Sequence, residues 1–267
     1  MHIDSHGFVV CPKCKANART AEGKPIPICP SCGVVFAKIL ASSPMSKQAH
    51  DEEQDDDTST NPTWKERFIT PPASDDTISD HDMWWVRAIG LGLLVWWSLH
   101  FITMNWHTNE IGSSFMHNIN LVFHEAGHLF FRPFGRLIMF FGGSFFQVLW
   151  PLILAAAFLL KYKNPFAASV CFAWAGQSLM DVAPYIGDAR SLQLGLIGEY
   201  NEDIVDMRSE RHDWHNILGD LGLLEKDQLI ANLAHNGGRL MLIIACVWAA
   251  AIVYAQYQSQ RSEKLED

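Results

Sequence analysis

Long stretches without a charged residue constrain the fold of this chain more than any other feature of its sequence. The 22 residues at 88–109 contain no Asp, Glu, Lys or Arg, and neither do the 24 residues at 137–160. A helix needs about 20 apolar residues to cross a bilayer core. Uncharged blocks of this length are rare in the alternative, a large soluble helical core. We therefore predict a mainly α, polytopic membrane protein with about five transmembrane helices, the other spans being the blocks 111–131, 166–180 and 240–255.

The chain before residue 84 is polar and acidic, and it lacks the apolar segment that a signal peptide requires. Residues 43–83 are rich in Ser, Thr, Pro and Asp, which predicts a disordered linker. Its acidic run is interpreted as a solvated spacer, with metal binding as the alternative. A net charge of −9 disfavours nucleic acid as a partner. The predicted domains are 1–42, the linker 43–83, and a helical membrane domain at 84–260 with a cytoplasmic amphipathic region at 188–239.

Four cysteines near the N-terminus form two CxxC pairs. Cys11 and Cys14 in CPKC are separated by 14 residues from Cys29 and Cys32 in CPSC. Two such pairs supply four thiolates to one tetrahedral zinc ion, and an all-cysteine site leaves no open position for catalysis. Redox-active pairs or two disulfides are the alternatives. The doubled motif resembles a zinc ribbon, and its free thiolates imply a reducing compartment, so we expect this domain in the cytoplasm.

The topology follows from counting spans from a cytoplasmic N-terminus. The span at 111–131 would return to the cytoplasmic face, where the basic turn at 132–136 agrees with the positive-inside tendency. The span at 166–180 would return to the same face. His124 and His128 would then lie at the same side of the membrane as Asp181, whichever side that is. We expect an integral protein of the cell's inner or plasma membrane.

The stretch HEAGH has the spacing of a metal site. His124 and His128 are four residues apart, so on a helix both imidazoles face one metal ion. Glu125 then lies beside a zinc-bound water and can accept its proton as general base. A third protein ligand is required, for which Asp188 is the first candidate and Asp181 the second. Histidines satisfied by polar neighbours are the alternative, but ionisable groups at membrane depth are costly and usually functional.

Three segments between residues 111 and 190 form a pattern: FHEAGH, the Gly-containing FFGGSFFQVLWP, and MDVAPYIGDAR. Together they resemble the site-2 protease family of intramembrane zinc metalloproteases. Members of that family have HExxH on one transmembrane helix and a third ligand in an Asp-Gly motif that follows Asn-x-x-Pro. Asp181 stands where that Asn would be, Pro184 matches the Pro, Asp188 would be the ligand, and Ala189 replaces the Gly. The resemblance implies hydrolysis of peptide bonds in a membrane-embedded substrate segment.

Several residues near these motifs have less specific interpretations. Under the same resemblance, Gln147 could hydrogen-bond a substrate strand. Gly142 and Gly143 could line a substrate groove or simply allow close helix packing. His117, two turns before His124, is expected to make a polar contact rather than to bind metal.

The segment RHDWHNILGDLGLL contains His212, Asp213 and His215. The two histidines, at positions i and i+3, could bind a metal. An amphipathic helix that lies on the membrane or caps the site explains the segment more simply. Its apolar residues are Trp214, Ile217, Leu218 and Leu221.

The sequence therefore predicts a zinc metalloprotease of site-2 protease type, with one structural and one catalytic zinc ion and a ribbon that recruits a protein partner. Two other functions stay open. A catalytically inactive membrane scaffold would use the ribbon as its working module and HEAGH as a structural clamp. A membrane zinc hydrolase acting on a lipid or small molecule would need Glu125 but leave membrane peptides intact.

Overall fold

The computed structural model describes residues 3–4, 7–8, 10–11, 13–17, 26–36, 63, 67–69, 84–195 and 208–266. The chain forms two compact units, Met1–Asn61 and Pro62–Asp267. As predicted, the protein is mainly helical. The predicted disordered linker at 43–83 falls almost entirely outside the described residues.

Short turns make up the described part of the first unit. Strand β1 (Ile3–Asp4) pairs antiparallel with β2 (Gly7–Phe8). Cys11, Cys29 and Phe36 are buried together in a small cluster. Each CxxC pair lies in a turn closed by one isolated β-bridge, Val10–Asn17 or Ile28–Val35.

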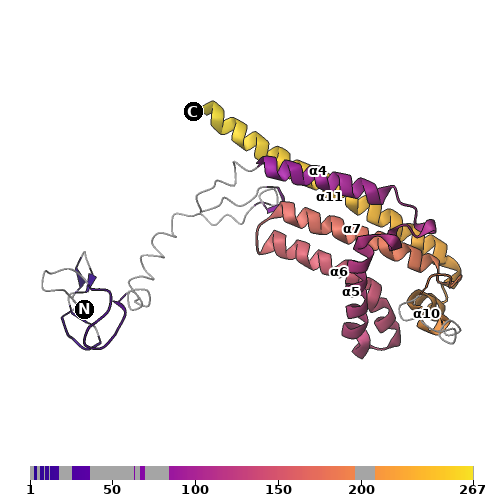
Figure 1. Ribbon diagram of the computed structural model, residues 1–267, viewed down its shortest axis with the longest axis horizontal. Helices are drawn as coiled ribbons and strands as arrows, with labels where there is room; N and C mark the ends of the chain where they lie inside the picture. Colours follow the sequence, from indigo (N-terminus) through magenta and orange to yellow (C-terminus); the bar gives the residue numbers. More distant parts are fainter. Residues whose placement is uncertain are drawn as a thin grey trace. The chain divides into compact units, whose positions relative to one another are not determined.

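Five long helices form the frame of the second unit in its described residues (Figure 1). They are α4 (Trp84–Ile102), α5 (Phe115–Phe131), α6 (Arg136–Leu160), α7 (Pro165–Gly187) and α11 (Asp227–Glu266). Shorter elements connect or cap them: η2 (Trp106–Thr108), η3 (Ile111–Ser113), η4 (Arg132–Phe134), α9 (Arg208–Arg211), α10 (Asp213–Asp220) and η5 (Leu224–Lys226).

Each of the five predicted apolar blocks falls largely within one long helix, although the block 88–109 extends beyond the end of α4 at Ile102. Among the described residues, three helical stretches are long and apolar enough to cross a membrane: Trp84–Ile102, Arg136–Leu160 and Leu224–Ser262. The chain is therefore compatible with a membrane protein, while the number of five spans stays a prediction. The last helix begins at Asp227, well before the apolar block at 240, so part of the predicted 188–239 region belongs to α11.

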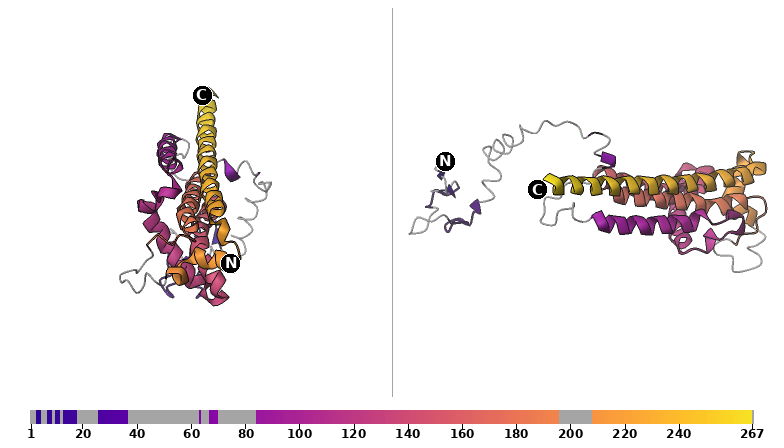
Figure 2. Two further views of the ribbon diagram at one scale, coloured as in Figure 1. Left: turned by 90° about the vertical axis from the view of Figure 1, so that its right-hand side faces the viewer. Right: turned by 90° about the horizontal axis from the view of Figure 1, so that it is seen from above.

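Helix α7 is the centre of the arrangement, because it packs along both α11 and α6. Helix α4 lies along α11, and α5 lies against α6 (Figures 1 and 2). Small residues explain how α11 can approach α7 so closely. A Cβ atom added to Gly238 would lie only 2.3 Å from the carbonyl oxygen of Gly176. The two helices therefore approach so closely at this point that no side chain fits at position 238.

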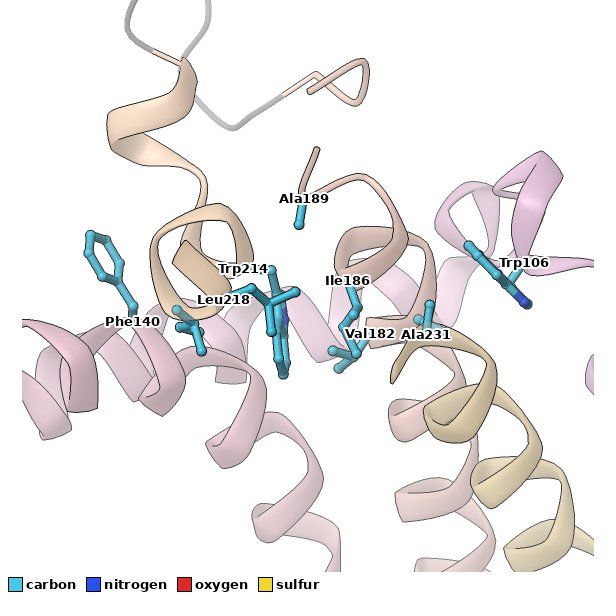
Figure 3. Close-up of a cluster of buried hydrophobic side chains, with 10 residues drawn as sticks. Trp106, Phe140, Val182, Ile186, Ala189, Trp214, Leu218 and Ala231 are labelled. Carbon is cyan, nitrogen blue, oxygen red and sulfur yellow. The ribbon is translucent and has the colours of Figure 1, made fainter. Parts of the chain in front are cut away.

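Helix α10 is held on the ends of α6 and α7 by its apolar side. Trp214 and Leu218, which are 9% and 1% exposed, project from α10 beside Val182 and Ile186 of α7 (Figure 3). Burial of a large apolar side chain contributes about 1.5–3 kcal/mol, which an eight-residue helix needs because it is too short to be stable alone. The segment thus forms an amphipathic helix, as predicted, and its apolar side packs on α6 and α7.

Candidate metal centre

The HEAGH histidines lie in the second half of α5, on the side that faces α6. The helix begins at the N-cap Ser114, whose hydroxyl accepts a hydrogen bond from the backbone N–H of His117. Gly127 then allows α6 to cross closely, since a Cβ there would lie 2.2 Å from the carbonyl oxygen of Gly142. This close crossing buries His124, which is 7% exposed.

Both imidazoles are oriented by hydrogen bonds from their Nδ1 atoms. His124 Nδ1 lies 2.9 Å from Gln147 Oε1, and His128 Nδ1 lies 2.9 Å from the carbonyl oxygen of Met139. The Gln147 amide nitrogen donates to the carbonyl of Ser178 at 3.2 Å, which turns its oxygen toward His124. Each Nδ1 therefore carries the proton and donates it to an oxygen. This arrangement is typical of histidines that bind a metal through Nε2.

The two Nε2 atoms converge on one carboxylate oxygen of Asp213. His124 Nε2 lies 2.9 Å and His128 Nε2 lies 3.1 Å from Asp213 Oδ2. Burial raises the pKa of Asp213, but hydrogen bonds and charge from His124 and His128 outweigh it, so the pKa lies below its ordinary value. The carboxylate is thus ionised at neutral pH. These three residues form a group that could hold a metal ion.

The chemistry of this donor set fits zinc. Without a metal ion, each Nε2 can donate a hydrogen bond to the Asp213 carboxylate. A bound cation would take the place of these protons, because an imidazole protonated at Nδ1 presents a lone pair at Nε2. Ligand atoms bonded to zinc at 2.0–2.1 Å in a tetrahedron lie roughly 3.3 Å apart. The observed separations of 2.9 and 3.1 Å are close to that value. Two imidazoles and one carboxylate would leave the fourth position open.

Gly143 makes space for this centre. A Cβ added there would lie 2.7 Å from His124 Nε2 and 2.7 Å from His128 Nε2. The glycine on α6 therefore lies directly against both imidazoles, whereas Gly142 lies against Phe131 and α5. Gly142 therefore allows close packing of the two helices, as one of the two interpretations expected. Gly143 leaves room for the histidine rings.

Asp213 is brought to the histidines by the first turn of α10. His212 is the N-cap of this helix and accepts a hydrogen bond from the backbone N–H of His215. The indole N–H of Trp214 donates to Ser144 Oγ at 3.0 Å, and the backbone N–H of Asp213 donates to Tyr185 Oη at 2.9 Å. Contacts to α6 and to α7 therefore fix the position of the Asp213 carboxylate.

The structure does not place Asp188, the first-choice third ligand, with the two histidines. Its carboxylate accepts hydrogen bonds from Ser191 Oγ and from the backbone N–H groups of Gln193 and Leu194, at 2.5–2.9 Å. His212 Nε2 lies 3.5 Å from Asp188 Oδ2. Burial raises the pKa of Asp188, but the contacts with His212, Ser191 and the two amides lower it below its ordinary value. Asp188 thus holds the loop after α7 and the cap of α10.

Asp181, the second-choice ligand, is also occupied elsewhere. Its carboxylate lies 3.0 and 3.2 Å from His117 Nδ1 and 3.2 Å from the Asn120 amide nitrogen. Asn120 also donates to Gln177 and accepts from the indole N–H of Trp174. His117 therefore makes a polar contact, as predicted, and its partner is the very residue proposed as an alternative ligand.

The histidines of the 211–224 segment do not join the centre either. His215 Nδ1 lies 2.7 Å from the carbonyl oxygen of Ala189, and His212 serves as the α10 cap. The residue between them, Asp213, is the candidate ligand that the sequence pattern does not identify. One signal could have identified it. An acidic residue that directly precedes a buried Trp at the start of an amphipathic helix is carried toward the core.

A cavity of about 640 Å³ opens at the centre, within the size range of small-molecule sites. Glu125, the predicted general base, lines it together with His124, His128 and Asp213. The cavity extends along α5 to His117. The histidines, the carboxylate and the glutamate therefore share one accessible space, in which a ligand or water can reach all of them.

The four N-terminal cysteines form a second group that could hold a metal ion. Cys11 Sγ lies 3.7 Å from Cys32 Sγ, and Cys14 Sγ lies 3.5 Å from Cys29 Sγ, so all four are free thiols. A backbone hydrogen bond from Ala16 lowers the pKa of Cys14, but contacts with the other three cysteines raise it to about 12. Four thiolates at this distance therefore need a cation to coexist.

The two CxxC turns have the same backbone geometry. The residue after each second cysteine is left-handed, with φ of 59° at Lys15 and 69° at Gly33. Its N–H donates to the carbonyl of the first cysteine of the pair at 2.9 Å. Comparisons with protein-family models, curated proteins and solved structures find no match to this chain.

Proposed function

We propose that the protein is a membrane-embedded zinc metalloprotease that hydrolyses a peptide bond of a membrane-embedded substrate. One observation carries the proposal. The Nε2 atoms of His124 and His128 converge on Asp213, and Glu125 lines the same cavity. Two imidazoles, a carboxylate ligand and a free glutamate are the set that zinc hydrolases use.

The residues divide the chemistry among them. Zinc, when bound, supplies Lewis acidity that makes a water molecule acidic near neutral pH and polarises a carbonyl group. Glu125 accepts the proton of the attacking water and passes it to the nitrogen of the leaving amine. His124, His128 and Asp213 hold the ion. Gln147 and the Met139 carbonyl hold the rings in the tautomer that binds it.

The shape of the cavity favours a peptide over a small molecule. It follows α5 from His117 to His128, a rise of about 16 Å at 1.5 Å per residue. An extended chain advances about 3.3 Å per residue, so the groove accommodates about five residues of an unwound substrate. The apolar helices around it favour a substrate that is itself in the membrane. We extend the proposal to five spans and a cytoplasmic N-terminus.

The first unit is proposed to be a zinc ribbon that binds a protein partner. Its two equivalent CxxC turns and the group of four thiols support this interpretation. An all-cysteine site has no open coordination position, so it would stabilise the module rather than catalyse a reaction. If the helical unit had no hydrolytic activity, this module would be the working part, and the protein would be a membrane scaffold.

Zinc stoichiometry on the detergent-purified full chain tests the metal centre. We expect two zinc ions in the wild type and one in the His124→Ala, His128→Ala double variant. One zinc ion in both would remove the chemistry on which the protease proposal depends. The scaffold function would then be favoured.

Hydrolysis is tested with Glu125→Gln, which removes the base and leaves the three ligands in place. We expect two zinc ions as in the wild type, and a roughly 10²–10⁴-fold loss of cleavage of co-expressed membrane peptides. Glu225→Gln is the matched control, because Glu225 is exposed and forms a surface ion pair with Arg190. Unchanged cleavage in Glu125→Gln would contradict the mechanism. Loss of lipid turnover with intact membrane peptides would instead indicate a lipid hydrolase.

A further inference from the structure

We propose that the Tyr185 hydroxyl donates the hydrogen bond that stabilises the substrate oxygen on which negative charge develops during hydrolysis. The inference rests on the hydrolytic function proposed above and assigns a further catalytic residue to the same centre. Neither the HEAGH spacing nor the resemblance to site-2 proteases points to this tyrosine. It follows from the placement of the hydroxyl in the structure.

The hydroxyl lies next to the ligand set. Tyr185 is in the last turns of α7 and lines the cavity that also contains Glu125. Its Oη accepts the backbone N–H of Asp213 at 2.9 Å. The side chain of the same Asp213 contacts both Nε2 atoms. The hydroxyl therefore contacts the backbone of the same residue whose side chain contacts both histidines.

The ring of Tyr185 is held in place on two sides. Its centroid lies 4.2 Å from that of His212, which caps α10, and 5.9 Å from that of His124. A donor that is fixed before the reaction does not have to reorient as charge develops, which is the condition for effective stabilisation. Tyr185 meets this condition because α7, α10 and α5 all contact it.

The proton of this hydroxyl is available to a ligand. A phenol oxygen accepts hydrogen bonds through its lone pairs and donates through its single proton. The Asp213 N–H takes up a lone pair of the hydroxyl oxygen. The Asp213 carboxylate is also within reach of the O–H group. With that carboxylate engaged as a metal ligand, the O–H proton can turn toward a substrate oxygen in the cavity. A phenol keeps that proton at neutral pH.

The reaction balances without any change in Tyr185. Water loses one proton to Glu125, its oxygen bonds to the carbonyl carbon, and the electron pair of the carbonyl bond moves onto the carbonyl oxygen. The Tyr185 O–H donates a hydrogen bond to that oxygen. When the carbon–nitrogen bond breaks, the electron pair returns, and the amine leaves with the proton held by Glu125. Donors in this position are typically worth about 10²–10³-fold in rate.

Binding of acetohydroxamic acid tests the proposal without a known substrate, because its carbonyl oxygen occupies the place of the substrate oxygen when it chelates zinc. Titration calorimetry on the zinc-loaded full chain compares Tyr185→Phe with the wild type. We expect about tenfold weaker binding, the effect of one lost hydrogen bond, at unchanged zinc content and unfolding temperature. Tyr162→Phe is the matched control, since Tyr162 is 58% exposed, and it should bind as the wild type does.

Three results would overturn the proposal, and they differ from one another. Equal affinity in Tyr185→Phe would show that the hydroxyl does not reach the ligand. A loss of zinc in Tyr185→Phe would show that the hydroxyl only positions Asp213 through its backbone N–H. Binding that is absent in the wild type, or that survives in the His124→Ala, His128→Ala variant, would remove the metal centre itself, and the proposed function would fail together with the inference.

Discussion

Asp213 and Asp188 both contact histidines, but their surroundings give the two carboxylates different roles. Asp213 faces two Nε2 atoms, whereas Asp188 is occupied by a hydroxyl and two backbone amides. Removing the negative charge of a ligand costs metal affinity directly. We expect Asp213→Asn to lose the membrane-domain zinc, leaving one ion per chain by elemental analysis, and Asp188→Asn to retain both. The opposite outcome would restore Asp188 as the ligand that the family resemblance implies.

Asp188 should instead contribute to stability, in a manner that depends on pH. Its folded pKa is lowered, so its contribution is fully present above the unfolded pKa of about 3.9 and is lost as the pH falls through the folded pKa. At pH 7 we expect Asp188→Asn to lower the free energy of unfolding by about 1–3 kcal/mol. The difference from the wild type should shrink below about pH 4. Denaturant unfolding in detergent at a series of pH values measures it, and a difference independent of pH would contradict the assignment.

At the scale of elements, the space for the histidine rings between α5 and α6 depends on a residue without a side chain. Gly143→Ala would place a methyl group 2.7 Å from His124 Nε2 and His128 Nε2, so the rings or the helices must move apart. We expect loss of the membrane-domain zinc and about 1–3 kcal/mol of destabilisation. Gly92→Ala on α4 is the control, because a Cβ there meets nothing within 4 Å. It should retain both zinc ions and be slightly more stable, since alanine favours a helix.

At the scale of the whole molecule, the two groups that could hold a metal ion lie in different compact units. We expect Cys11→Ser, Cys14→Ser to lose one zinc ion and leave the other. Nine of the ten tryptophans lie between residues 84 and 248, and Trp64 lies in the predicted linker, so residues 1–42 contribute no tryptophan fluorescence. The tryptophan emission and its thermal midpoint should not change in this variant. A shift in either would show that the ribbon zinc also stabilises the helical unit.

Features that depend on neighbouring residues could be predicted from the sequence. The uncharged blocks lie largely in helices. Each block could be recognised from the sequence because its apolar residues are consecutive and belong to one helix. Cys11, Cys14, Cys29 and Cys32 form one group, since each CxxC turn closes over four residues. His124 and His128 face one point because one turn of a helix separates them.

The third member of the candidate centre was decided by tertiary structure alone. Asp213 is 89 residues from His124 along the chain, and no local spacing connects them. The choice between Asp213 and Asp188 depends on how α10 lies on α6 and α7, which is set by the burial of Trp214 and Leu218. The sequence by itself determined that two histidines share one helix face and that a glutamate lies beside them. Only the packing of α10 determined which carboxylate reaches them. That packing depends on apolar contacts between residues that are far apart in the sequence and have no regular spacing along it.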